Sequence, residues 1–245
     1  MAINWFKYAA PSSFYSLSGK LIPWFAWPAA VLFCTGLYIG FFVAPEDAVQ
    51  SEAYRIIFIH VPASILSMLI YLIMAGYAAL GLIFNTRLSS MMATALAPTG
   101  ALFAFISLWT GALWGKPMWG AWWVWDARLT SELILLFLYL GFIALQASIE
   151  DPRRADRAGA LLAIVGSVNV PIIYFSVQWW NTLHQGSTVK LSGTSMHIAM
   201  QQAMFTMLVA MWCYVIAIAL LRVRSIILER ERNTHWVAEL AEVKQ

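Results

Sequence analysis

Long apolar runs alternate with short polar connections along the chain, and the alternation occurs six times. An α-helix needs about 20 apolar residues to cross the roughly 30 Å hydrocarbon core of a bilayer, and each run reaches that length. The pattern predicts an all-α integral membrane protein, folded as a six-transmembrane-helix bundle. The predicted spans are Leu21–Val43, Ile56–Phe84, Met91–Gly111, Leu129–Ile149, Gly159–Trp180 and Ile198–Leu221.

The six runs leave a polar segment at the C-terminus. We therefore expect a membrane domain over residues 1–222 and a cytoplasmic tail over residues 223–245. The tail mixes apolar residues with charges, a composition that fits either a surface amphipathic helix that docks a partner or a continuation of the sixth span.

Composition agrees with a membrane protein and excludes other classes. Of the 245 residues, 61% are hydrophobic and only 11% are charged, whereas about 25% are charged in a soluble domain. The chain has no basic stripe away from the segments next to the membrane, so nucleic acid is not an expected partner. Cys34 and Cys213 lie in apolar runs, and no C-x-x-C or C-x-x-C-H occurs. Thiol exchange and covalent attachment of haem to this chain are therefore not expected.

The basic residues predict the orientation of the bundle. If both termini are cytoplasmic, eleven of the fifteen lysines and arginines lie in cytoplasmic segments, which is a clear positive-inside bias. The connections at 44–55, 112–128 and 181–197 are then extracytoplasmic. The four basic residues left on that side are Arg55, Lys116, Arg128 and Lys190.

The predicted loop at about 112–128 contains an unusual concentration of tryptophan. Five tryptophans fall within thirteen residues, between two apolar runs. An aromatic belt that anchors helix ends distributes its rings over many connections, whereas here one connection holds them all. We favour a preformed surface for a large, flat, partly apolar ligand, with simple membrane anchoring as the alternative. The tryptophans are Trp114, Trp119, Trp122, Trp123 and Trp125.

Two histidines are predicted to flank this loop. His60 lies four residues into the second apolar run, and His184 follows the fifth span by four residues. Each has an ordinary explanation, a hydrogen-bonded packing residue for His60 and a solvated loop residue for His184. Together, two neutral imidazoles can occupy the axial positions of an iron porphyrin. His197 lies on the same side and competes with His184 as the second ligand, whereas His235 lies in the tail.

The propionates of a porphyrin need cationic partners. Arg55 and Arg128 are the favoured candidates, because arginine forms bidentate hydrogen bonds with carboxylates and because both residues lie at span boundaries. The alternatives are snorkelling for Arg55 and an ion pair of Arg128 with Asp126 or Glu132. Asp126 itself is expected to orient the loop by accepting hydrogen bonds. Thr130, Ser131 and Glu132 open the predicted fourth span, where a hydroxyl or carboxylate cap is favourable.

These residues resemble a known family. The string Trp119–Asp126 is similar to the tryptophan-rich "WWD" signature of haem-handling proteins in bacterial cytochrome c maturation. Its flanks, with Tyr54–Pro62 and Trp179–Ser187, resemble the haem exporter protein C (CcmC) family within that group. The resemblance extends from about the first span to Ser187 and includes the number of spans.

The resemblance implies an inner-membrane protein that holds haem b transiently on the periplasmic side, between His60 and His184. It implies transfer of the haem to a periplasmic haem chaperone. It further implies assembly with an ABC ATPase subunit, a second membrane subunit and a small single-span subunit. The chain has no G-x-x-x-x-G-K-[ST] motif, so any ATP hydrolysis would belong to a partner.

Two other functions remain as alternatives. A haem lyase or cytochrome c synthase also carries a WWD loop, but such relatives look larger and have a further histidine pair inside the bilayer. A permease that carries haem through its own bundle would place polar groups at mid-membrane. We expect an apolar interior with no carboxylate deep in any span, so we favour haem transfer without enzymatic chemistry.

Overall fold

The structure is a computed structural model that describes residues 5–184, 189–190, 193–194 and 196–242. Six helical segments in the described chain are long and apolar enough to cross a membrane, which confirms the predicted six-span, all-α architecture. These candidate spans are Pro11–Val43, Glu52–Phe84, Arg87–Trp119, Ala127–Ser148, Pro152–Trp179 and Ile198–Arg230.

The spans are built from the following elements. The first joins α1 (Pro11–Tyr38) to a π-helical turn, η2 (Ile39–Val43), and the second joins a 3-10 turn, η3 (Glu52–Ile56), to α2 (Ile57–Phe84). α3 (Arg87–Trp119) and α4 (Ala127–Ser148) each form one span, α5 (Pro152–Gly166) and α6 (Asn169–Trp179) share the fifth, and α7 (Ile198–Arg230) is the sixth. Outside them lie η1 (Trp5–Ala9), the antiparallel strands β1 (Val189–Lys190) and β2 (Gly193–Thr194), and α8 (His235–Glu242).

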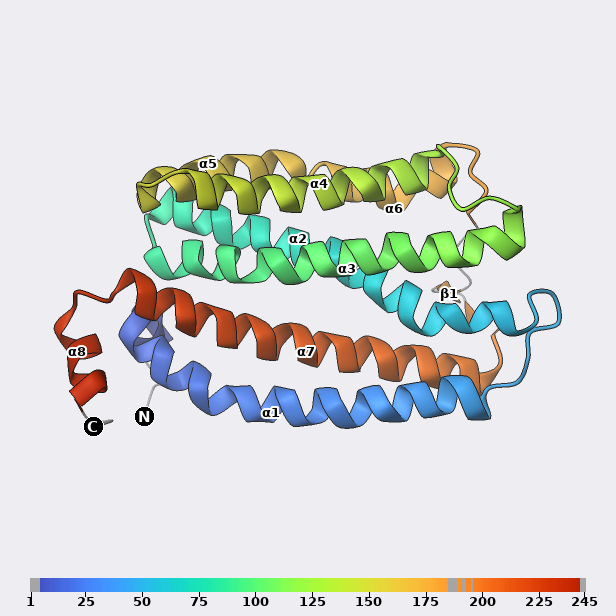
Figure 1. The fold of residues 1–245 in the computed structure, drawn as a ribbon, viewed down its shortest axis with the longest axis horizontal. Helices are drawn as coiled ribbons and strands as arrows, with labels where there is room; N and C mark the ends of the chain where they lie inside the picture. Colours follow the sequence, from blue (N-terminus) through green and yellow to red (C-terminus); the bar gives the residue numbers. More distant parts are fainter. Residues whose placement is uncertain (1–4, 185–188, 191–192, 195, 243–245) are drawn as a thin grey trace.

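The helices pack in a layered bundle (Figure 1). α1 and α7 lie side by side, α2 and α3 form an antiparallel hairpin against α7, and α4, α5 and α6 lie on the far side of that hairpin. Both termini and the α2–α3 and α4–α5 turns lie at one end of the bundle, which we call the terminal end. η3, the α3–α4 connection and the β1–β2 hairpin lie at the other, which we call the loop end.

Local sequence explains where the helices turn. Asn85 ends α2 in the left-handed conformation, with φ of 52°, and the α2–α3 connection is correspondingly tight. Gly120 ends α3 in the same region, with φ of 78°, and its N–H donates to the carbonyl of Lys116 at 3.1 Å. The fifth span is interrupted between Gly166 and Asn169 because Pro171 has no N–H to donate to the turn before it.

The core lies between α2, α3, α4 and α7, and tyrosines occupy its centre. The rings of Tyr71 and Tyr139 meet edge to face with their centroids 4.9 Å apart, and both side chains are fully buried. The outward faces remain apolar. Trp24 on α1 is 76% exposed, for example, as expected for a surface that faces lipid.

Several helices extend beyond the predicted spans. α1 begins at Pro11 rather than Leu21, α3 continues to Trp119, and α7 continues to Arg230. The prediction followed apolar runs alone, whereas helices continue into polar turns wherever packing supports them. The short α8 then folds back, so that the rings of Trp236 and Tyr15 lie 5.7 Å apart. The tail therefore packs against its own bundle.

Candidate functional site

His60 is held by α3 at the loop end of the bundle. Its Nδ1 lies 3.0 Å from the carbonyl oxygen of Ser107 and 3.0 Å from Oγ1 of Thr110. A carbonyl oxygen can only accept, so we assign the proton to Nδ1, which leaves the lone pair on Nε2. Gly111 permits this approach, because a Cβ there would lie 3.3 Å from Cε1 of His60. A histidine whose Nδ1–H is held in this way has Nε2 available as a metal ligand.

The structure brings His184 to face His60. The ring centroids are 6.2 Å apart and the ring planes differ by 33°. Metal–imidazole bonds are about 2.0–2.1 Å and a ring nitrogen lies about 1.1 Å from its ring centre, so two axial imidazoles have centroids roughly 6.3 Å apart. The observed spacing fits one metal ion between the two rings.

His197, the competing ligand, has a different role in the structure. Its side chain caps α7, and its Nδ1 accepts a hydrogen bond from the backbone N–H of Ala199 at 3.2 Å. His235 lies in α8 at the terminal end, where its Nδ1 is 3.1 Å from Oε1 of Glu239. Of the four histidines, His60 and His184 are therefore the pair whose rings face each other.

The tryptophans divide into two groups, because the connection is shorter than the predicted 112–128 loop. Trp114 and Trp119 lie on the last turns of α3, where their rings meet edge to face at 5.1 Å. Nε1 of Trp114 donates to Oε1 of Gln50 at 2.8 Å, which ties α3 to the α1–α2 connection. Trp114 is one helical turn beyond Thr110, so it lies on the same face of α3 as the contact to His60.

The other three tryptophans belong to the non-helical connection between Gly120 and Asp126. Trp123 and Trp125 pack edge to face with their centroids 5.3 Å apart. Trp125 is 78% exposed and Trp122 is 55% exposed. The indole N–H of Trp123 is buried and, among the described residues, has no hydrogen-bond partner. The connection therefore combines two exposed rings with a buried donor that a ligand can satisfy.

Asp126 fixes the end of this connection. Its Oδ1 accepts the backbone N–H of Leu129 at 2.8 Å, so Asp126, and not Glu132, is the N-cap of α4. The prediction that Thr130, Ser131 and Glu132 open the fourth span is wrong, because α4 begins at Ala127 and these residues lie within the helix. Oδ2 of Asp126 is buried and has no partner within the described chain.

Arg128 points into the bundle. It donates to the carbonyl of Ile173 on α6 at 2.7 Å and to Oγ of Ser64 on α2 at 3.3 Å. The described residues include no ion pair of Arg128 with Asp126 or Glu132. Ser64 lies one turn after His60 on the same face of α2, so the guanidinium is one helical turn from the histidine.

Beneath Arg128 lies a buried polar cluster that the sequence analysis missed. Glu132 is 4% exposed and accepts a hydrogen bond from Ser67 at 2.9 Å, while Asn169 donates to the carbonyl of Ser131 at 2.9 Å. The interior is therefore polar rather than apolar in this region, although Glu132 lies on the second turn of α4 and not deep in the span. Arg128 and Glu132 are four residues apart, a spacing that places both on one face of a helix and was the available signal.

Arg55 stabilises the α1–α2 connection through its hydrogen bonds. Its guanidinium donates to the carbonyls of Gly40 and Ala44, at 2.5 and 3.1 Å, and forms a two-point ion pair with Glu52. The side chain is 14% exposed. Lys116 donates to the carbonyl of Gly120. The side chain of Lys190, and residues 185–187 of the family signature, lie outside the part of the chain that the structure describes.

The fold and the site define a class: a multi-pass membrane protein with two facing imidazoles beside a tryptophan-rich connection at one end of its bundle. Residues 4–238 match the family model described as "Heme exporter protein C". The chain is 47% identical over 232 residues to Heme exporter protein C of Escherichia coli K12, covering 95% of this chain and 94% of that relative. We conclude that the chain belongs to the haem exporter protein C (CcmC) family.

Other relatives agree. Heme exporter protein C of Haemophilus influenzae is 44% identical over 236 residues, covering 96% of each chain. A "putative cytochrome c biosynthesis ccmC-like mitochondrial protein" of Marchantia polymorpha is 44% identical over 192 residues, covering 78% of this chain and 82% of that one. The resemblance noted in the sequence is therefore confirmed over most of the chain.

Proposed function

We propose that the protein binds haem at the periplasmic face of the bacterial inner membrane and delivers it to a periplasmic haem chaperone during c-type cytochrome biogenesis. The observation that carries the proposal is the 6.2 Å separation of the His60 and His184 rings, which matches axial ligation of one iron. The names of the relatives, haem exporters and a cytochrome c biosynthesis protein, support haem as the cargo.

The positive-inside bias supports the membrane orientation in this proposal. The α2–α3 and α4–α5 turns, which carry Arg87 and the arginines at 153, 154 and 157, lie at the terminal end with both termini. We therefore assign the terminal end to the cytoplasm and the loop end, with the histidine pair, to the periplasm.

The remaining residues of the proposed site surround the macrocycle. The five tryptophans supply aromatic faces and indole donors for the ring, and Asp126 holds the connection in place. Arg55 and Arg128 are the proposed partners of the propionates, with Arg128 the better placed because it is one helical turn from His60. In such a site the protein orients the haem while the reactivity belongs to the haem itself, so we propose a transfer role without enzymatic chemistry.

The proposal includes a complex. The partners are an ABC ATPase subunit, a second membrane subunit and a small single-span subunit, with ATP hydrolysis in the ATPase. The word "exporter" in the relatives' names supports a transport assembly. The apolar exposed faces of α1, including Trp24 and Trp27, leave area for lipid and for neighbouring membrane subunits.

The absorption spectrum of the purified wild-type protein tests the proposal directly. We expect bound haem b with a six-coordinate, low-spin spectrum, because two imidazoles complete the coordination of the iron. A protein that carries no haem after purification from haem-replete cells, or a five-coordinate high-spin spectrum, would contradict ligation by the histidine pair.

The two exposed tryptophans test the role of the connection. Replacing Trp122 and Trp125 together by alanine should reduce haem content and transfer several-fold while leaving the melting temperature unchanged, because both side chains are largely exposed. The matched control replaces Trp24 and Trp27, which are 76% and 72% exposed on α1, by alanine. Normal haem content in the Trp122/Trp125 variant, or an equal loss in the control, would show that the connection is only a membrane anchor.

A further inference from the structure

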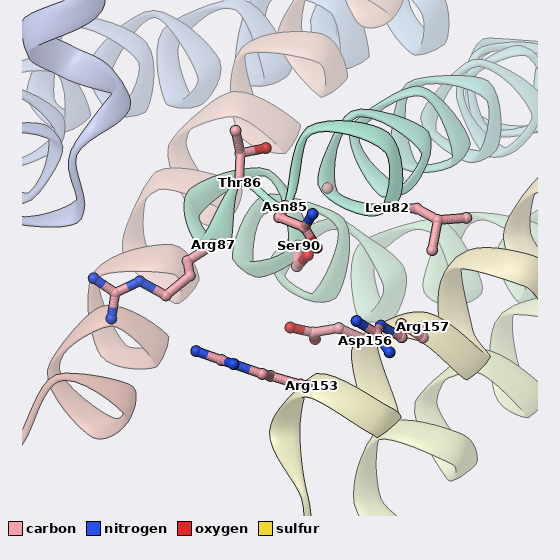
Figure 2. A pocket seen from close by; sticks show the side chains of 9 residues that line it. Leu82, Asn85, Thr86, Arg87, Ser90, Arg153, Asp156 and Arg157 are labelled. Carbon is pink, nitrogen blue, oxygen red and sulfur yellow. The ribbon is translucent and has the colours of Figure 1, made fainter.

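A cavity lies at the terminal end, which is the opposite end of the bundle from the histidine pair. It has a volume of about 200 Å³ and lies between the α2–α3 turn and the first turns of α5 (Figure 2). The histidines and tryptophans discussed above are not among its lining residues. Its lining is polar and basic, with Asn85, Arg87, Ser90, Arg153, Asp156 and Arg157.

Three arginines give this cavity an excess of positive charge. Arg87 is paired with Glu231 at 2.7 Å, and Asp156 is paired with Arg230 at 2.7 Å, so these charges are neutralised. Arg153 and Arg157 line the cavity and form no ion pair within the described chain. In Figure 2 the side chains of Arg87 and Arg153 extend toward the same side of the cavity, from α3 and α5.

Hydrogen-bond donors complete the anion-binding character of the cavity. Asn85 and Ser90 contribute an amide and a hydroxyl from the α2–α3 turn. Guanidinium groups with such donors suit a phosphate group, because arginine matches the geometry of phosphate oxygens.

The surface beyond the arginines is apolar, and this identifies the source of the phosphate. Arg153, Arg157, Leu161 and Val165 follow one another at intervals of four along α5, so they form one stripe on its surface. Leu161 is 58% exposed and Val165 is 71% exposed. The stripe therefore begins with two arginines that form no ion pair within the described chain and continues with exposed apolar side chains within the span. A phospholipid has the same arrangement, with a charged headgroup followed by apolar acyl chains.

We propose that this cavity is a binding site for the headgroup of an anionic phospholipid, with the lipid phosphate on Arg153 and Arg157 and an acyl chain along Leu161 and Val165. A basic pocket between spans on the cytoplasmic side is the kind of site that anionic lipids occupy. Two unpaired positive charges favour a lipid with net negative charge over a zwitterionic one, whose ammonium group they repel.

Lipid binding to the purified full-length protein tests this site. Native mass spectrometry or a thermal shift should show tighter binding of phosphatidylglycerol than of phosphatidylcholine with the same acyl chains. The double substitution Arg153→Gln and Arg157→Gln should weaken phosphatidylglycerol binding roughly 25-fold, since one arginine near the surface contributes about fivefold. Arg157→Gln alone should weaken phosphatidylglycerol binding about fivefold. Both side chains are exposed, so the bundle should melt as the wild type does.

The matched control is the double substitution Arg154→Gln and Arg232→Gln, which removes two exposed charges at the same end but none from the cavity. It should leave phosphatidylglycerol binding unchanged. An equal loss in both double variants would overturn the proposal in favour of general surface charge. Stabilisation by inorganic phosphate as strong as that by phosphatidylglycerol would also overturn it, in favour of a free phosphate.

Discussion

Replacing either His60 or His184 by alanine is expected to lower the haem retained by the purified protein more than tenfold and to abolish transfer to a chaperone. Mutation of a residue that only orients a metal ligand lowers metal affinity about 10–100-fold. Loss of the ligand itself should lower the affinity at least as much. The two ring centroids are 6.2 Å apart, so in the proposed site either substitution would remove one of the two imidazole ligands. Haem content by pyridine haemochrome assay and the absorption spectrum measure the effect.

His197→Ala is the matched control for this experiment. His197 lies at the same end of the bundle, but its Nδ1 caps α7 and it does not face the pair. The variant should keep the six-coordinate spectrum and lose only the stability of a helix cap, about 0.5–2 kcal/mol. Unchanged haem content in the His60 and His184 variants would contradict axial ligation, and loss of the spectrum in the His197 variant would reassign the second ligand.

The sequence was sufficient to predict the spans, because continuous apolar runs leave few other structures available in a bilayer. It was less reliable at the ends of α3. The segment from Gly111 to Trp119 contains two glycines, a lysine and a proline, which predict a loop. The helix continues because Gly111 and Gly115 are packed closely, Gly111 against His60 and Gly115 against Trp119.

The sequence predicted the candidate site only in part. Hydropathy and charge indicated that His60 and His184 lie at one end of the bundle, but neither could give their separation. That separation depends on where the chain runs after α6, a helix that starts only after the interruption before Asn169. The contacts of Arg128 and Glu132 join residues more than 40 positions apart, and no local pattern encodes such pairs.

Gly100→Ala is expected to destabilise the bundle strongly. A Cβ at this position would lie 2.1 Å from Cζ of Tyr139. Real Cβ atoms are essentially never found closer than 3.0 Å to another heavy atom of this kind. The ring cannot withdraw, because its hydroxyl donates to the carbonyl of Ser67 at 2.7 Å and Tyr71 packs against it edge to face. Overpacking a close-packed core costs about 1–3 kcal/mol, and a fixed ring places this case at or above the upper limit. Thermal melting in detergent measures the loss.

Two further variants separate this clash from a general effect of adding a methyl group to a helix. Gly76→Ala makes the same change on α2, where a Cβ would meet nothing within 4 Å, and it should melt at or slightly above the wild-type temperature because alanine favours helix by about 0.5–1 kcal/mol. Adding Tyr139→Leu to Gly100→Ala removes the ring that clashes, so the double variant should be more stable than the sum of the single changes. A Gly100→Ala protein that melts like the wild type would show that α3 and α4 do not pack as closely at this point as the ring of Tyr139 requires.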